Sequence, residues 1–276
     1  MKLFFKNTYL FLGSWLLLSF SSKAQVRSSA YELISSIPVE AKFFTSDKLQ
    51  QLYIVTPDNT VIKYSPDGEE LFRYNNNTIG ELTHIDATNP FNLLLYYPEF
   101  QTAITLDRTL NKIGEFNLWD LQVVDVRAVG LAVDNGLWVF DAATYTLKKI
   151  SQEGQLLRQS DNLSLLLGLT PSPSKLVARA NFVYVNDPGI GILVFDNFGQ
   201  YDRSLPITGI DDFQVVENRI LYQIDNAYFI YNLKSFGEMQ FPLPQGIAEP
   251  LQVRLQKDQL YVLLEKRLNV YGGNKK

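Results

Sequence analysis

The chain repeats one pattern six times, in which alternating apolar residues end in a hydrophobic anchor and a polar turn follows. Successive anchors are separated by 36 to 45 residues, and they are Tyr64, Leu106, Ile150, Phe195, Tyr231 and Tyr271. A repeat of about 40 residues built from short strands is typical of a β-propeller, because one small sheet cannot bury both of its faces alone. The pattern therefore predicts an all-β protein, a six-bladed β-propeller.

The first repeat shows the strand plan most clearly. Residues 52–55, 60–64 and 71–74 are largely apolar runs, and the turn Ser65-Pro66-Asp67-Gly68 separates the last two. Pro-Asp-Gly between two apolar runs is a hairpin signal, because proline and glycine supply the backbone angles that a tight turn requires. Three successive antiparallel strands are therefore expected in each repeat.

A further strand precedes each repeat and is expected to line a central channel. The six candidates are residues 41–44, 84–87, 123–128, 176–181, 213–216 and 251–255. The sixth repeat lacks its outermost strand, since the chain ends soon after Tyr271, and residues 31–37 are free to supply it. Such pairing leaves no exposed edge. We predict one domain over residues 25–276, with the N-terminal strand closing the last blade.

The first 24 residues have the features of a secretory signal peptide. Lys2 and Lys6 give a positive start, residues 9–20 form an apolar stretch too short to span a bilayer comfortably, and residues 22–24 fit a small-x-small cleavage site. We expect cleavage after Ala24 and a periplasmic protein that does not span the membrane once cleaved. An uncleaved N-terminal anchor is the alternative.

Composition excludes several classes of function. The chain has 25 Lys and Arg against 29 Asp and Glu, a net charge of -4, so it lacks the basic field that nucleic-acid binding needs. It contains one histidine, His84, and no cysteine. A thiolate nucleophile, a cysteine-rich zinc site and a multi-histidine metal site are therefore impossible.

Polar residues on or beside the expected channel strands are the candidates for binding. They are His84, Asp86, Asp125, Arg127, Arg179, Asn181, Asp211, Asp212 and Arg254. Four of them carry oxygen ligands that suit a Ca²⁺ or Mg²⁺ ion, which makes a metal site the weaker alternative: Asp86, Asp125, Asn181 and Asp212. Because arginines lie on the same strands, ion pairs in a wet channel are favoured over a metal. No catalytic residue and no cofactor are assigned.

Two sequence phrases carry a resemblance to a known family. Residues 52–68 and 138–150 resemble the repeats of exported six-bladed, NHL-like propellers of Bacteroidetes-type bacteria, and residues 89–111 are similar to small periplasmic propellers of the same bacteria. The resemblance covers nearly the whole mature chain and supplies no catalytic residues. It implies an accessory subunit of a machine in the cell envelope.

We therefore expect a non-catalytic periplasmic scaffold that binds a protein partner, in an outer-membrane or type IX secretion complex. An enzyme is the alternative from another class, namely a hydrolase or lactonase that holds a divalent cation in the channel. A propeller that captures a carbohydrate or peptide in the channel is intermediate between the two.

Overall fold

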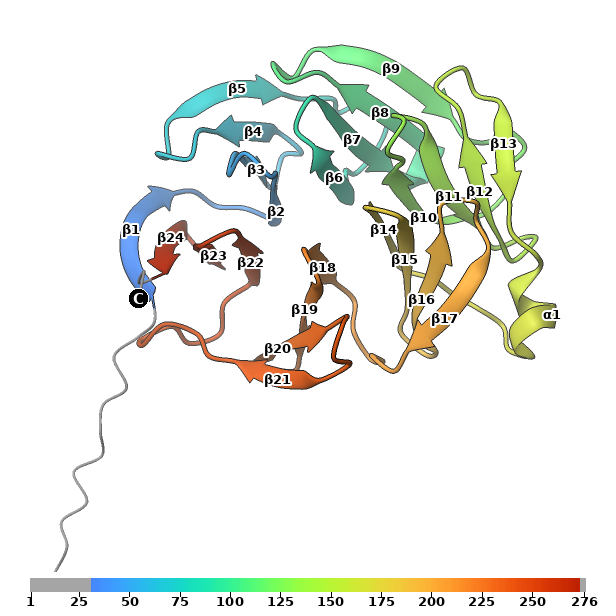
Figure 1. Ribbon diagram of the computed structural model, residues 1–276. Helices are drawn as coiled ribbons and strands as arrows, with labels where there is room; N and C mark the ends of the chain where they lie inside the picture. The colour runs from blue at the N-terminus through green and yellow to red at the C-terminus, as the bar shows by residue number, and fades with distance from the viewer. Residues whose placement is uncertain (1–30, 274–276) are drawn as a thin grey trace, which may run out of the picture.

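The computed structural model describes residues 31–273, so the predicted signal peptide and its cleavage site after Ala24 lie outside the described residues. Within this range the chain forms six four-stranded sheets, which stand as blades around a central channel (Figure 1). The predicted all-β, six-bladed β-propeller is confirmed. A helix long and apolar enough to cross a membrane is absent from residues 31–273.

Each blade is an antiparallel meander that runs outward from the channel. The innermost strands are β2 (Phe43–Ser46), β6 (His84–Asn89), β10 (Val126–Leu131), β14 (Lys175–Arg179), β18 (Phe213–Val216) and β22 (Gln252–Gln256). The second strands are β3 (Leu52–Val55), β7 (Asn92–Tyr97), β11 (Leu137–Asp141), β15 (Phe182–Asp187), β19 (Arg219–Ile224) and β23 (Gln259–Leu264). The third strands are β4 (Val61–Tyr64), β8 (Thr102–Leu106), β12 (Thr146–Ile150), β16 (Gly191–Asp196), β20 (Ala227–Asn232) and β24 (Arg267–Gly273). The outermost strands are β5 (Glu70–Tyr74), β9 (Lys112–Asn117), β13 (Leu156–Gln159), β17 (Tyr201–Leu205), β21 (Glu238–Phe241) and β1 (Tyr31–Pro38).

The N-terminal strand closes the ring, as the sequence predicts. β1 pairs antiparallel with β24, from Tyr31 opposite Gly273 to Pro38 opposite Arg267, with one irregularity after Leu33. In Figure 1 the blue first strand lies beside the red last strand. The final blade therefore contains both ends of the described chain, and opening the ring would require breaking this pairing.

The core lies between the blades rather than inside any one of them. Every residue of β3, β7 and β11 is buried, whereas every residue of β13 is exposed. Trp138 and Phe140 of β11 pack against Leu176 and Val183 of the next blade. Burial of large aromatic side chains across this contact holds adjacent sheets face to face.

Aspartate side chains close many of the turns. The Asp107, Asp187 and Asp196 carboxylates each accept a backbone N–H from two residues further on, at 2.8 to 2.9 Å. Asp141 does the same at 3.1 Å and also accepts the Lys148 ammonium at 2.6 Å. These local bonds satisfy backbone groups that the strands leave unpaired and fix the turns.

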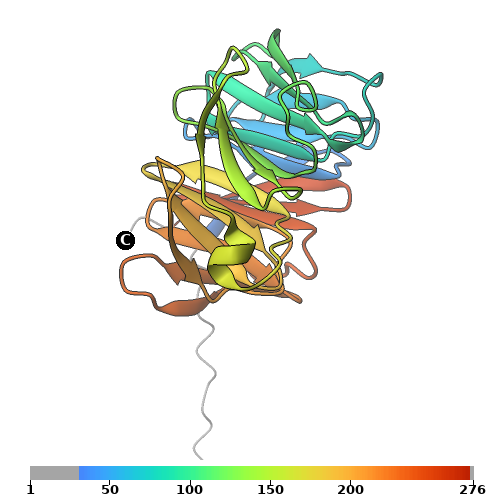
Figure 2. The ribbon, with the colours of Figure 1, turned by 90° about the vertical axis from the view of Figure 1, so that its right-hand side faces the viewer.

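The inner strands define two ends of the channel. Each inner strand begins at the end we call the first mouth, where the links between blades and the turns joining second and third strands also lie. Each ends at the second mouth, in a hairpin that leads to the second strand. The two short helices, η1 (Pro98–Phe100) and α1 (Leu163–Leu167), belong to the loops of the first mouth. Figure 2 shows α1 on the rim of the ring.

Only β18 has the bounds expected from the sequence; the other five inner strands differ by one to three residues at one or both ends, and two of these shifts move candidate residues. β10 begins at Val126, not at residue 123, because the Val123 N–H bonds the Leu118 carbonyl at 3.1 Å within the preceding loop. β14 ends at Arg179, not at residue 181, because Ala180 adopts a left-handed φ of 54° in a tight turn. Asp125 and Asn181 consequently lie outside the strands on which we expected them.

Candidate functional site

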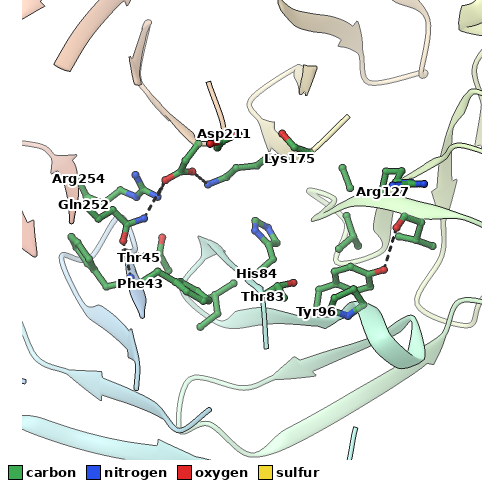
Figure 3. A pocket seen from close by; sticks show the side chains of 18 residues that line it. Phe43, Thr45, Thr83, His84, Tyr96, Arg127, Lys175, Asp211, Gln252 and Arg254 are labelled. Carbon is green, nitrogen blue, oxygen red and sulfur yellow. Dashed lines mark hydrogen bonds and ion pairs between the residues drawn. The ribbon is translucent and has the colours of Figure 1, made fainter. Parts of the chain in front are cut away.

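A cavity of about 530 Å³ opens at the first mouth of the channel (Figure 3). Its walls come from the starts of all the inner strands except β18, whose place is taken by the two aspartates just before it. Polar and charged side chains line it: Thr45, Thr83, His84, Arg127, Ser174, Lys175, Asp211, Asp212, Gln252 and Arg254. Every blade therefore contributes to one site.

A charge network on one side of the cavity joins three blades. The Asp212 carboxylate forms ion pairs with both Lys175, on β14, and Arg254, on β22. The Gln252 amide donates to Asp212 at 3.1 Å and accepts the Phe44 N–H at 2.8 Å, which extends the network to the first blade. Figure 3 shows Lys175, Gln252 and Arg254 directed toward this point.

Burial and charge act in opposite directions on this network. Desolvation in the channel favours the neutral form of Asp212, but Arg254 and Lys175 outweigh it and hold the pKa of the carboxyl far below its usual range. Burial lowers the pKa of the Lys175 ammonium, and Asp212 acts in the opposite direction. The carboxylate is therefore fixed in its charged form and its charge is shared between two cations.

His84 stands at the start of β6 and faces the same space. Its ring lies in the channel, and its Nε2 atom is buried with no hydrogen-bond partner among the residues that the structure describes. Desolvation, with a contribution from Lys175, lowers the pKa of His84 to about 3. The imidazole is therefore neutral at physiological pH.

The remaining candidate residues are dispersed. Asp125 and Arg127 form an exposed pair with each other at 2.9 Å, and Arg127 lies on the side of the cavity away from Arg254 (Figure 3). Asp211 is exposed and makes no hydrogen bond or ion pair among the described residues. Arg179 and Asn181 lie at the second mouth, at the opposite end of β14 from Lys175.

The structure does not bring the four suggested metal ligands together. Asp86 is buried, and its two carboxylate oxygens accept the N–H groups of Leu131 and Thr88, each at 2.8 Å. Asp212 and Asn181 lie at opposite ends of the channel, separated by a strand of about 15 Å. Residues 31–273 contain no cluster of three or more His, Asp or Glu side chains able to hold a metal ion.

Sequence reasoning missed two members of the network, Lys175 and Gln252. Lys175 stands one residue before the strand expected from residue 176, and Gln252 lay inside an expected strand but was not singled out. Only their position in the strand could have identified these two residues, because the first residue of an inner strand faces the first mouth. Composition alone does not distinguish these residues from the other surface polar groups.

An apolar surface adjoins this cavity on the loops of the second and third blades. Phe100 of η1 and Trp119 and Val124 of the loop before β10 are each more than half exposed; we call these three residues the aromatic patch. The loops are joined, since Gln101 accepts the Leu118 N–H at 3.0 Å and donates its side-chain amide to the Val124 carbonyl at 3.2 Å. The exposed side chains are therefore held on an ordered backbone.

Comparisons with known proteins identify a fold and no family. No protein-family model matches the chain, and no curated protein sequence does. Among solved structures, the Pan2 WD40 domain of Neurospora crassa matches with a TM-score of 0.62 at 11% identity, covering 89% of this chain and 96% of that one. Virginiamycin B lyase from Staphylococcus aureus matches with a TM-score of 0.59 at 11% identity, covering 88% and 99%.

A third match is the extracellular domain of a putative one-component system from B. thetaiotaomicron, with a TM-score of 0.53 at 14% identity. It covers 84% of this chain and 33% of that protein. At these identities the similarity establishes the propeller fold alone, because propellers host enzymes and binding proteins alike. The resemblance to NHL-like propellers of Bacteroidetes stays a prediction.

Proposed function

We propose that this protein is a non-catalytic scaffold of the bacterial periplasm, whose first mouth holds a protein partner in an outer-membrane or type IX secretion complex. The observation that carries the proposal is the aromatic patch, Phe100, Trp119 and Val124. Large apolar side chains exposed together on an ordered surface are typical of protein interfaces, in which tryptophan is the most frequent hot spot.

The surroundings of the patch fit a protein partner. Two hydrogen bonds between the loops and the bonds within residues 118–123 fix the backbone, so little conformational entropy is lost on binding. The polar cavity beside the patch supplies a hydrated rim, as interfaces commonly have. The signal peptide expected from the sequence and the shared fold of an extracellular bacterial domain support a location outside the cytoplasm.

Affinity capture from native envelopes tests the proposal. The wild-type chain is expected to retain a stoichiometric envelope protein, and the double variant Phe100→Ala and Trp119→Ala is expected to lose it. Phe236→Ala is the matched control, because Phe236 is an equally exposed aromatic residue in a distant hairpin. Equal recovery with all three proteins, or a monomer without a partner after crosslinking, contradicts the proposal.

A second candidate is the capture of a small polar ligand, such as a sugar, in the first-mouth cavity. The buried, unpartnered Nε2 atom of His84 favours it, because such an atom lacks the hydrogen bond that a ligand hydroxyl would supply. Thermal-shift screening with sugars separates the two functions: a ligand that stabilises the wild type and fails to stabilise His84→Phe supports capture. The hydrolase alternative requires in addition a bound metal and an activity lost in Asp212→Asn.

A further inference from the structure

The second mouth carries a groove that the proposed scaffold function does not use. Its volume is about 330 Å³, and it lies across the hairpins that end the inner strands of four successive blades. Lys48 comes from the first blade, Asn89 from the second, Val133 from the third and Arg179 from the fourth. We call this surface the basic groove.

The groove is positively charged in an acidic protein. None of the residues that line it is acidic, although the whole chain has a net charge of -4. The side chains of Lys48 and Arg179 make no hydrogen bond or ion pair with any other residue between 31 and 273. Both cations are therefore available to a partner.

The acidic side chains of the surrounding hairpins are already occupied. Asp47 is buried, accepts the Leu49 and Gln51 N–H groups and the Tyr53 hydroxyl, and closes its own turn. Asp134 pairs with Lys149 at 2.7 Å. Neither carboxylate forms an ion pair with Lys48 or Arg179, so both cations of the groove remain available to an anion.

Apolar side chains stand on the tips of three of these four hairpins. Leu49 is 46% exposed, Phe91 59% and Val133 73%. The corresponding tips of the other three blades carry smaller or polar residues: Ala180 and Asn181, Glu217 and Asn218, and Lys257 and Asp258. The tips of the first three blades are therefore apolar, and those of the other three are not.

The hairpins of the second and third blades are joined to each other by a side-chain hydrogen bond. Asn89 donates its amide to the Asn135 side chain of the next blade at 2.8 Å and accepts the Phe91 N–H at 3.0 Å. These bonds fix the positions of the two hairpins and reduce the entropy lost on binding.

We propose that the basic groove binds a short acidic segment of a partner protein, with carboxylates pairing with Lys48 and Arg179 and an apolar side chain lying between Leu49, Phe91 and Val133. The charge pattern selects this occupant, because an acidic segment supplies the anions that the groove lacks. The binding surface is separate from the aromatic patch, so it adds a second docking site to the scaffold and does not depend on the first.

Fluorescence anisotropy with a labelled peptide tests the proposal on the mature protein. The probe is Gly-Glu-Phe-Glu-Leu-Glu-Gly, and two control peptides replace either its glutamates with lysine or its apolar residues with serine. We expect the acidic probe to bind, the basic peptide not to bind, and the serine peptide to bind about fivefold more weakly. Binding of the acidic probe should weaken about tenfold when salt rises from about 50 to about 500 mM.

The variant Lys48→Glu with Arg179→Glu should weaken binding of the acidic probe at least about thirtyfold. The matched control is Lys266→Glu with Arg267→Glu, an exposed pair of the same charges at the β23–β24 turn, which should bind as the wild type does. Lys48→Ala provides a milder variant, and circular dichroism verifies that each variant folds. Absence of binding by the acidic probe, equal binding of the acidic and basic peptides, or wild-type binding by the folded Lys48→Glu, Arg179→Glu variant overturns the proposal.

The two docking sites are distinguishable in this experiment. Phe100→Ala with Trp119→Ala should leave binding of the acidic probe unchanged, since the aromatic patch lies at the other end of the channel. Loss of probe binding in that variant would show that the peptide binds at the first mouth and would also overturn the assignment to the basic groove.

Discussion

The two mouths of the channel contain similar residues in different partnerships. At the first mouth Lys175 and Arg254 share Asp212, and Arg127 pairs with Asp125. At the second mouth the side chains of Lys48 and Arg179 have no ion-pair partner within residues 31–273, because nearby carboxylates such as Asp47 and Asp86 accept backbone N–H groups instead. The difference shows that the partners of a charge, and not the count of charges, decide whether a surface is stabilised internally or left open to attract another molecule.

Removing the shared carboxylate of the first mouth should have the largest effect. Asp212→Ala leaves Lys175 and Arg254 mostly buried, close together and without their anion. Because Asp212 itself is partly exposed, we expect a loss of about 2 kcal/mol in the free energy of unfolding rather than the larger cost of a fully buried pair. Urea unfolding measures it. The adjacent Asp211→Ala is the control and should change little; equal losses in the two variants would show that the network does not stabilise the fold.

Truncation of the aromatic patch should have the next largest effect. It should weaken binding of the partner and leave the free energy of unfolding unchanged. Trp119→Ala is expected to weaken affinity for the captured partner by about 2 kcal/mol, or about thirtyfold, because an exposed tryptophan at an interface is typically a hot spot. Stability should stay near that of the wild type, since the side chain is more than half exposed. Titration calorimetry with the purified partner measures the affinity, and an unchanged affinity would remove Trp119 from the interface.

His84 should make the stability of the protein depend on pH. Its pKa of about 3 in the folded state lies below the usual value of about 6.5, so between these values the unfolded chain binds a proton that the folded chain does not. Stability should therefore fall as pH is lowered from about 6.5, by roughly 1 kcal/mol at pH 5, because the ring is partly accessible from the channel.

Because the chain has one histidine, the variant His84→Gln isolates this effect. Urea unfolding of the variant should lose most of the pH dependence between about pH 6.5 and 5, and only the carboxylates should act below that range. An identical pH profile in the wild type and the variant would mean that His84 titrates normally in the folded protein.

The smallest effect should come from an unpaired cation of the second mouth. Arg179→Ala breaks no ion pair or hydrogen bond within residues 31–273. We expect the free energy of unfolding to change by less than about 0.5 kcal/mol, as for most surface substitutions. A loss as large as that of Asp212→Ala would show that Arg179 has an internal role and would remove the contrast between the two mouths.

The fold was predictable from the sequence because local sequence patterns define each propeller repeat. Alternating apolar runs and turns such as Ser65-Pro66-Asp67-Gly68 set the strands, and the missing outer strand of the last repeat predicted the pairing of β1 with β24. Strand ends were predicted less well. A loop hydrogen bond at Val123 and a left-handed turn at Ala180 shifted them by a few residues, which repetition cannot reveal.

The candidate site was predictable only in part, because local patterns indicate where strands lie but not which residues of different blades meet. His84 at the start of β6 and Arg254 near the start of β22 line the cavity, and so does Asp212, which directly precedes β18. Asn181 does not, because a strand that begins at one mouth carries its last residues to the other. Contacts between blades, such as that of Gln252 with Asp212, join residues 40 positions apart and leave no trace in a single sequence.

Site-specific photo-crosslinking in living cells tests the central proposal, that the first mouth holds an envelope protein, most directly. A photo-reactive phenylalanine analogue in place of Trp119 is compared with the same analogue in place of Met239, an equally exposed residue on the outer strand β21. The account predicts one abundant adduct with an envelope protein at position 119 and none at position 239. No adduct at position 119, or the same adduct at both positions, would contradict it.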